Sequence, residues 1–204
     1  MIIVKVTSKN SAELIKAAVK VLRRGGVIAF PTETVYGLGC DPRNEKAVKK
    51  IFQIKGRVES KPLQLIAGSR AQVDRLASMT KMEKELGEKH WPGPLTLLVG
   101  LRNGKKLAKQ INPKRIIGIR VSSSEFARSL AVAFGHPVAA TSANRSGSAP
   151  ASSGRGVVHA FAEFPVKPDL LLDVGAIPRR KPSTVARVLP SGIVEVIRQG
   201  SIRL

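Results

Sequence analysis

Four polar segments of the sequence hold residue types that could bind an anionic group and transfer part of it. Each follows or flanks an apolar run: PTETVYGLG (Pro31 to Gly39), KGRVESK (Lys55 to Lys61), TSANRSG (Thr141 to Gly147) and RRKPSTVA (Arg179 to Ala186). Ligands of α/β proteins commonly bind where strands end, so these segments could meet at one site. Arginine offers a planar fork of donors to oxyanions, and lysine offers a point charge. The residue types therefore favour phosphate or carboxylate ligands.

Each segment alone also has a simpler interpretation. KGR could be a solvated helix end, where the helix dipole favours cations. PTET could be only a cap or a turn. TSANRSG could be an ordinary Asx turn, although its backbone N–H groups and hydroxyls would also suit phosphate oxygens. Only the combination of the four segments is specific.

Alternating helices and strands must position these segments. Runs of branched apolar residues predict strands near residues 2–6, 27–30, 63–67, 95–100, 116–121, 138–141 and 170–173. Apolar residues at helical spacing predict helices near residues 11–24, 44–55, 70–77, 81–90, 124–134 and 157–162. Residues 183–200 predict a hairpin that turns at Pro190-Ser191-Gly192, and PTETVYGLG is either a loop or a turn-rich strand. The alternation predicts one α/β (α+β) domain over residues 1–204 with a mixed sheet.

The composition excludes several classes of protein. The chain has 204 residues, of which 43% are hydrophobic, enough to bury a core. No apolar run approaches the ~20 residues of a membrane span, and the first residues lack the pattern of a signal peptide. Cys40 is the only cysteine, which excludes an internal disulfide and favours a cytoplasmic location. His90, His136 and His159 lack ligand spacing, so we expect no protein metal site.

The charge balance favours a polyanionic partner. There are 35 Lys and Arg against 14 Asp and Glu, a formal net charge of +21. RNA or nucleotide phosphates would suit this charge, whereas a solubility surface or a bias of the lineage is the simpler explanation. Aromatic residues are 4% of the chain, too few for a base-stacking platform. Leu101 to Arg115 contains six cations and no carboxylate, and is either an RNA-facing patch or a solvated loop.

Seven blocks of the sequence, taken together, resemble the YrdC-like threonylcarbamoyl-AMP synthases, also called TsaC. In chain order they are FPTETVYGLGCDP, KGR with KPL shortly after it, WPGPLTLL, IGIRV, PVAATSANRSG, KPSTVARV and VIRQG. They follow the family's order and cover nearly the whole chain, which is similar to the short form of the family with the YrdC-like domain only. The resemblance implies a twisted mixed sheet flanked by helices and a large, positively charged cavity.

The resemblance also implies a reaction. A nucleotidyltransferase of this family, an L-threonylcarbamoyladenylate synthase, makes threonylcarbamoyl-AMP, pyrophosphate and water from L-threonine, bicarbonate and ATP. The product serves threonylcarbamoylation of adenosine 37 in ANN-decoding tRNAs. Mg²⁺ is expected to arrive with ATP, held mainly by phosphates and water. The implied partners are these substrates, tRNA or another RNA, and downstream threonylcarbamoyl-transferase proteins.

Nine residues take site roles by this resemblance. Around ATP it places Lys55, Arg57, Lys61, Ser142, Asn144 and Arg198, and around threonine it places Thr32, Arg120 and Ser183. Lys55 and Arg57 are the expected catalytic residues, because fixed cations offset the repulsion among carboxylate, carbamate and phosphate groups. Adenylyl transfer needs alignment and charge stabilisation more than a protein nucleophile. Ser183 and Arg198 could instead serve strand packing, and Arg120 could pair with a structural carboxylate such as Glu125.

Three other functions remain open at this point. The first is a non-catalytic RNA- or tRNA-binding protein of the YrdC-like fold, which the charge supports. The second is a fold relative that makes a sugar phosphate with a carboxylate-bound metal, but the four polar segments are nearly free of acids. The third is a paralogue whose activity is lost or changed. ATP–pyrophosphate exchange that depends on threonine and bicarbonate separates the synthase from the RNA-binding protein.

Overall fold

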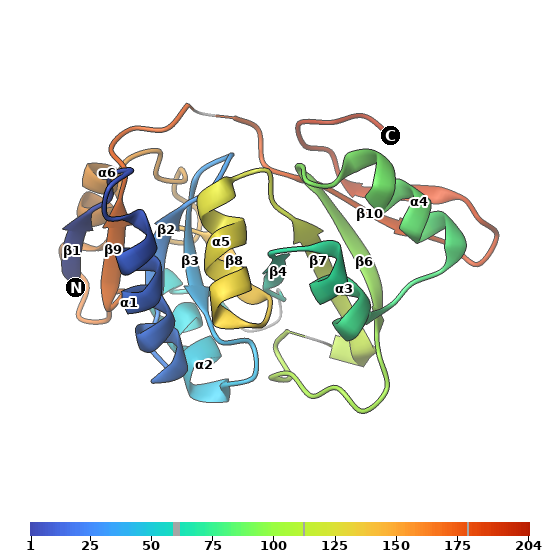
Figure 1. Ribbon diagram of the computed structural model, residues 1–204, viewed down its shortest axis with the longest axis horizontal. Helices are drawn as coiled ribbons and strands as arrows, with labels where there is room; N and C mark the ends of the chain where they lie inside the picture. Colours follow the sequence, from blue (N-terminus) through green and yellow to red (C-terminus); the bar gives the residue numbers. More distant parts are fainter. Residues whose placement is uncertain (59–61, 112, 179) are drawn as a thin grey trace.

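One mixed β-sheet runs the length of the molecule (Figure 1). The computed structural model describes residues 1–58, 62–111, 113–178 and 180–204. Within them the strands are β1 (Ile2–Lys5), β2 (Ile28–Pro31), β3 (Tyr36–Cys40), β4 (Gln64–Ala67), β5 (Ala77–Ser78), β6 (Leu95–Leu101), β7 (Ile116–Val121), β8 (Val138–Ser142), β9 (Leu170–Asp173), β10 (Thr184–Val188) and β11 (Val194–Arg198). Their order is β1-β9-β2-β3-β8-β4-β7-β6-β10-β11, and β5 pairs with β6. Parallel and antiparallel pairs both occur, so the predicted mixed sheet is confirmed.

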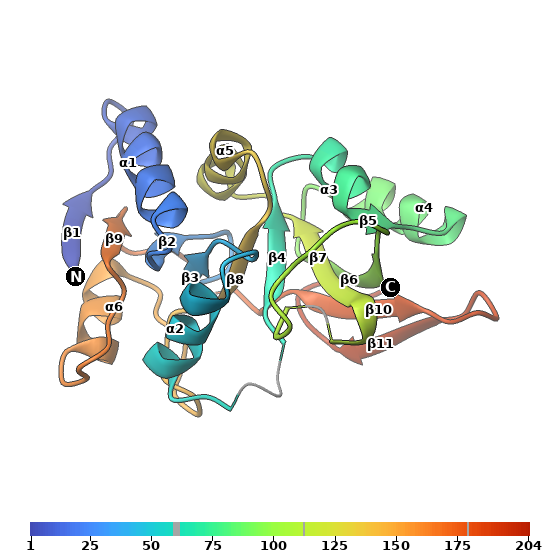
Figure 2. The ribbon, with the colours of Figure 1, turned by 90° about the horizontal axis from the view of Figure 1, so that it is seen from below.

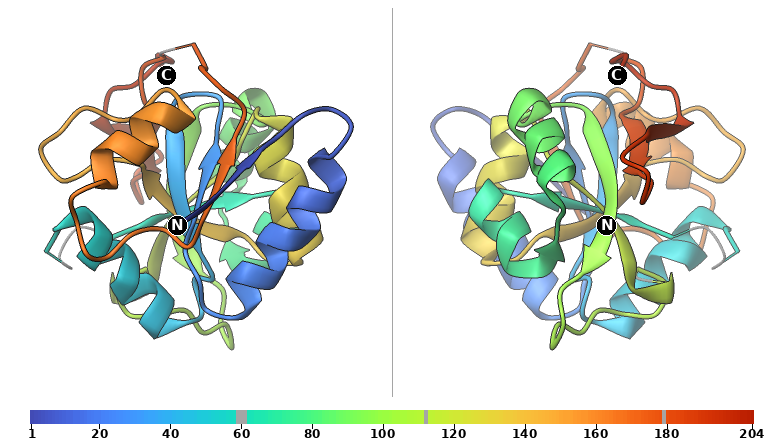
Figure 3. Two further views of the ribbon diagram at one scale, coloured as in Figure 1. Left: turned by 90° about the vertical axis from the view of Figure 1, so that its left-hand side faces the viewer. Right: turned by 90° about the vertical axis from the view of Figure 1, so that its right-hand side faces the viewer.

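Helices cover both faces of this sheet. In the described part of the chain they are α1 (Ser11–Arg23), α2 (Glu45–Lys55), α3 (Arg70–Leu76), α4 (Lys81–His90), α5 (Glu125–Phe134) and α6 (Gly154–Phe161), with a short 3₁₀ turn at Pro113–Arg115. Figure 2 shows α1, α5, α3 and α4 along one side and α2 and α6 along the other. The end-on views in Figure 3 show the strand direction turning along the sheet. No helix among the described residues is long and apolar enough to cross a membrane.

The alternation of side chains along β2 explains why both faces of the sheet are covered. Ile28 and Phe30 point to one face, where they pack with Leu22 of α1 and Leu130 of α5. Ala29 points to the other face, toward the second and larger core cluster. Because successive strand residues point to opposite faces, a strand that is apolar throughout must be buried on both. The sheet is therefore a rigid middle layer from which loops can present polar side chains.

The strand registers bring the starts and ends of four strands together. Gly37 of β3 lies opposite Ser142 of β8, and Gln64 of β4 lies opposite Ala140 of β8. β7 runs parallel to β4 with Ile66 beside Arg120. The start of β3, the end of β8 and the start of β4 therefore share one region of the sheet, and Arg120 reaches it from β7.

Most of the predicted elements are confirmed, within a few residues at their ends. The segment PTETVYGLG forms a turn followed by strand β3, and the terminal hairpin turns where Gly192 N–H donates to Leu189 C=O. Asn44 caps α2 by accepting from the N–H of Ala47. β5 was not predicted, because two residues are too short to show a strand pattern. Cys40 is buried, as expected of a small core residue.

Candidate active site

A cavity of about 460 Å³ opens where the strand ends meet. Its lining includes six of the nine predicted site residues: Thr32, Arg57, Arg120, Ser142, Ser183 and Arg198. Lys55 and Asn144 lie directly behind this lining, and Lys61 falls outside the described residues. Among the described lining residues four are arginines and none is a carboxylate. The cavity is therefore suited to a ligand with several negative charges.

The turn Thr32–Val35 forms one wall of the cavity. The Thr32 hydroxyl donates to the carbonyl of Val35 at 2.6 Å and accepts from the N–H groups of Thr34 and Val35, both at 3.3 Å. This local pairing is the ST-turn that threonine favours, and it joins β2 to β3. Because the single Thr32 proton is used inside the turn, this hydroxyl has no proton left to donate to a ligand.

Lys55 supports a second wall, the turn that follows β8. Its ammonium donates to the carbonyls of Ser142 and Asn144 at 2.7 and 2.9 Å and to Asn144 Oδ1 at 3.1 Å. The Ser142 hydroxyl donates to the same amide oxygen at 2.6 Å. Lys55 is only 3% exposed, so all three of its donors serve the protein. Burial, followed by the charges of Arg57 and Arg145, lowers the pKa of Lys55 to about 8.

Arg57 reaches the cavity because α2 ends abruptly at Gly56. Gly56 has a φ of +57°, a left-handed conformation that suits glycine, and its N–H bonds back to the carbonyl of Gln53. The chain thereby turns between Lys55, which points behind the wall, and Arg57, which lines the cavity. Burial lowers the pKa of Arg57 from its ordinary value. Lys55 and Arg57, which only Gly56 separates in the sequence, therefore lie in different surroundings.

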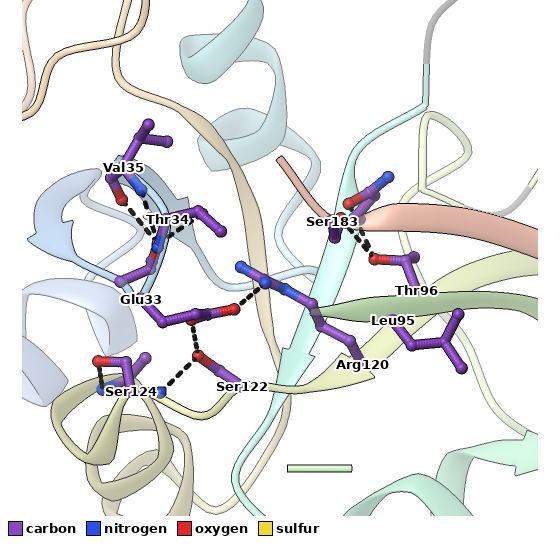
Figure 4. Close-up of polar contacts among 12 residues, drawn as sticks. Glu33, Thr34, Val35, Leu95, Thr96, Arg120, Ser122, Ser124 and Ser183 are labelled. Carbon is purple, nitrogen blue, oxygen red and sulfur yellow. Dashed lines mark hydrogen bonds and ion pairs between the residues drawn. The ribbon is translucent and has the colours of Figure 1, made fainter. Parts of the chain in front are cut away.

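Arg120 extends from β7 into the same space and forms a buried ion pair (Figure 4). Its Nη1 donates to Glu33 Oε1, and the Ser122 hydroxyl donates to Glu33 Oε2. Arg120 therefore pairs with a carboxylate of the protein, as the alternative interpretation of the sequence expected, but this carboxylate is Glu33 of the PTET turn and not Glu125. Burial lowers the pKa of Arg120, and the charge of Glu33 opposes this change.

The terminal hairpin places Ser183 and Arg198 side by side. Arg198 Nη2 donates to the Ser183 carbonyl at 2.9 Å and to its hydroxyl oxygen at 3.1 Å. The Thr96 hydroxyl lies 3.0 Å from the Ser183 hydroxyl. Burial, and then the charge of Arg120, lowers the pKa of Arg198. The fields of Arg120 and Arg198 therefore overlap in the cavity, and an anion between them would stabilise both.

Some lining or supporting residues were not predicted as site residues from the sequence. Thr34, Gln64 and Arg180 line the cavity, and Glu33 holds Arg120. Glu33 and Arg180 lie inside the quoted segments, and Glu33, the only acid of PTETVYGLG, was a signal that could have been followed. Gln64 gave no such signal, because it occupies an ordinary strand position. The described residues contain no group of three or more His, Cys, Asp or Glu that could hold a metal ion.

Comparisons with known proteins identify the relatives of this chain. Residues 20–200 match the model of the Sua5, YciO and YrdC family, whose description reads "Telomere recombination". The threonylcarbamoyl-AMP synthase of Chromohalobacter salexigens is 38% identical over 185 residues, which are 90% of this chain and 97% of that protein. The mouse threonylcarbamoyl-AMP synthase is 37% identical over 92% of this chain and 67% of its own length.

Solved structures agree with the sequence comparison. The P. abyssi Sua5 complexed with L-threonine superposes with a TM-score of 0.87 and 34% identity, over 98% of this chain. This chain spans 58% of that structure. The E. coli YciO superposes with a TM-score of 0.82 and 25% identity, over 98% of this chain and 94% of YciO.

Proposed function

Because the chain belongs to the Sua5, YciO and YrdC family, we propose that it is an L-threonylcarbamoyladenylate synthase. It is a nucleotidyltransferase that converts L-threonine, bicarbonate and ATP into threonylcarbamoyl-AMP, pyrophosphate and water, for modification of adenosine 37 in ANN-decoding tRNAs. The observation that carries the proposal is the cavity of about 460 Å³ whose lining combines four arginines with Thr32, Ser142 and Ser183. The proposal includes one catalytic unit over residues 1–204 and a cytoplasmic location.

The arrangement of charge suits this reaction. A carboxylate, a carbamate and a triphosphate must approach one another, and their mutual repulsion opposes the transition state. Donors that are fixed in advance can offset this repulsion without reorganising during the reaction. The arginine side chains in the lining come from separate segments, namely the α2–β4 loop, β7, the loop before β10 and the end of β11. The sheet holds these segments in place, so the cavity can be positively charged and still keep its shape.

The residues divide into two groups in the proposed complex. Arg57, Ser142 and Arg198 contact ATP, and Lys61 joins this side. Lys55 and Asn144 act from behind the lining by holding the turn after β8. Thr32, Arg120 and Ser183 contact threonine, the amino acid with which the P. abyssi Sua5 was complexed. ATP enters as its Mg²⁺ complex, in which phosphates and water hold the ion.

Direct detection of the product tests the proposal. The purified chain is incubated with ATP, Mg²⁺, labelled bicarbonate and L-threonine, and the labelled adenylate and pyrophosphate are measured. We expect product only when all three substrates are present, and at least a 10²-fold lower rate for Arg57→Ala, as for the loss of one fixed donor. Absence of the adenylate from well-folded protein that still binds RNA would favour the non-catalytic alternative.

A second cavity supports contact with tRNA or another RNA. It measures about 260 Å³ and is lined by cations from separate loops and helices, among them Arg43, Arg75, Lys105 and Lys106. Burial, and then the charge of Arg43, lowers the pKa of His136 in the same lining. The electric fields of several cations therefore overlap at this cavity, which includes part of the cationic segment Leu101 to Arg115. The proposal includes RNA phosphates at this surface and downstream threonylcarbamoyl-transferase proteins as partners of the product.

A further inference from the structure

Glu33 is a buried carboxylate next to the active cavity whose role the reaction does not by itself explain. Its side chain is 7% exposed, although its neighbours Thr32 and Thr34 both line the cavity. Burying a carboxylate is unfavourable unless it is paired and hydrogen-bonded. Both oxygens of Glu33 are used in this way, one by Arg120 and the other by Ser122.

The contacts of Glu33 form a chain that ends on a helix. The Ser122 hydroxyl donates to Glu33 and accepts from the N–H of Ser124 at 3.1 Å. Ser124 is the N-cap of α5, and Arg128 of that helix donates to the carbonyl of Ser122 at 2.9 Å. Figure 4 shows this line of contacts running from Ser124 through Ser122 and Glu33 to Arg120. The position of Glu33 is therefore tied to the end of α5.

A hydrogen bond at one nitrogen of a guanidinium group fixes the orientation of its plane and the direction of its other N–H donors. Glu33 accepts a hydrogen bond from Nη1 of Arg120. Arg120 lines the cavity, whereas Glu33 is not among the described residues that line it. A carboxylate is bound best by two parallel hydrogen bonds from one guanidinium, which requires a fixed plane. A free arginine side chain would first have to lose its rotamer freedom on binding.

We propose that Glu33 is a positioning residue for the amino-acid substrate. By holding Nη1, it aims the remaining N–H groups of Arg120 at the carboxylate of threonine. This inference rests on the proposed function, since it assigns Arg120 to the threonine carboxylate. Glu33 itself does not touch the substrate, and its effect passes through Arg120.

Two substitutions of Glu33 separate hydrogen bonding from charge. In Glu33→Gln the amide oxygen can still accept from Arg120, and the amide nitrogen can donate to the Ser122 hydroxyl. Both bonds remain while the negative charge is lost. Glu33→Ala removes both bonds. We therefore expect Glu33→Ala to raise the threonine KM by about 10- to 100-fold, with the ATP KM changed less than about twofold, and Glu33→Gln to restore most of the loss.

The path through Arg120 is tested by a double-mutant cycle. Arg120→Ala alone should raise the threonine KM, and adding Glu33→Ala to it should raise that KM no further. Calorimetric binding of threonine gives the same comparison without turnover. Ser122→Ala keeps the ion pair but frees Glu33 to move, so it should raise the threonine KM by a smaller factor. It serves as the second probe if Glu33→Ala does not fold, and thermal unfolding of each variant checks this.

The possible outcomes distinguish a failure of the proposed function from a failure of the proposed role of Glu33. If the wild type makes no adenylate, the proposed function is wrong. If the wild type is active and Glu33→Ala, or Ser122→Ala in its place, leaves the threonine KM unchanged, the inference is wrong. It is also wrong if the KM values for threonine and ATP rise together, because that pattern indicates a structural role. Independent effects of Glu33→Ala and Arg120→Ala in the cycle would overturn it as well.

Discussion

Lys55 and Arg57 are two residues apart and carry the same charge, yet they should act differently. Arg57 lines the cavity, whereas Lys55 donates all three of its hydrogen bonds to Ser142 and Asn144. A cation that faces a cavity can stabilise charge on a ligand directly. A buried donor with protein partners acts by keeping other groups in place.

Alanine substitution at each position distinguishes these roles. Arg57→Ala should lower turnover roughly 10²-fold and change the free energy of unfolding little, because it removes a cavity donor. Lys55→Ala should lower turnover by a similar factor and also destabilise the fold by about 2–3 kcal/mol, because buried acceptors lose their partner. Turnover and urea unfolding of the two variants provide the measurement. Near-wild-type turnover in both would remove the pair from the mechanism.

The pKa of Lys55 predicts a dependence of stability on pH. The folded value of about 8 lies below the ordinary 10.5, so the unfolded chain holds this proton more tightly. The cost of the buried charge is therefore fully present below pH 8 and is relieved as the pH rises from 8 toward 10.5. The stability of the wild type relative to Lys55→Met should increase over this window by up to about 3 kcal/mol.

Denaturant unfolding at pH 7 and pH 10 measures this difference. The comparison with Lys55→Met removes the contributions of the other titrating groups, which both proteins share. Lys16→Met, which removes an exposed lysine of α1, is the matched control. The prediction would be contradicted if the difference in the free energy of unfolding between the wild type and Lys55→Met were the same at both pH values.

At the scale of elements, the end of α2 decides where both cations point. Gly56 adopts a φ of +57°, and a Cβ at this position would overlap the guanidinium of Arg145. That guanidinium donates to the carbonyls of Gln53 and Ile54 at the end of the helix. The left-handed turn and its cap together place Lys55 behind the wall and Arg57 in the cavity.

Gly56→Ala should therefore impair both stability and turnover. A left-handed conformation is disfavoured for alanine by about 1–2 kcal/mol, and Arg145 would have to move as well. Gly104→Ala is the matched control, since Gly104 has a φ of +75° and a Cβ there would contact nothing within 4 Å. We expect both variants to lose stability in urea unfolding, Gly56→Ala the more because of Arg145, but a loss of turnover only in Gly56→Ala. Equal turnover in the two variants would show that the turn does not direct the cations.

At the scale of the whole molecule, two cation-lined cavities occupy opposite ends of β8. Ser142 at the end of this strand lines the larger cavity, and Pro137 just before its start lines the smaller one. Ala140 is the residue of β8 nearest to Pro137 that lines the larger cavity, so the two linings are three positions apart along this strand, about 10 Å at the usual rise. Substrates and RNA could therefore bind at the same time without competing for the same side chains.

Charge removal at the smaller cavity, and at Lys109 of the same loop, tests the contact with RNA. Changing Lys105, Lys106 and Lys109 to Gln should weaken tRNA binding and flatten the slope of log affinity against log salt by about one unit for each lost phosphate contact. Adenylate formation without RNA should not change. Lys9, Lys16 and Lys20 changed to Gln provide a control with the same loss of charge near α1. An affinity and a slope equal to those of the wild type would defeat the proposal.

The sequence alone determined much of this description, because it rests on local or linear information. Apolar runs and their spacing predicted the helices and strands, since periodicity reflects which faces are buried. The ordered motifs indicated the family and its reaction, which the comparisons with known synthases support. The motifs also named residues that the fold brings to one cavity, such as Thr32, Arg120 and Ser183.

Only the tertiary structure decided what each of these side chains contacts. Glu33 and Arg120 are 87 residues apart, and the sequence offered the nearer Glu125 only as an example of an alternative partner. Lys55 donates to acceptors that are 87 and 89 residues away in the sequence. Its burial could not be predicted, because a KGR segment is typical of an exposed helix end. Pairings of this kind depend on strand order and register, which bring distant segments together. Periodicity along the chain carries no information about which strand lies next to which.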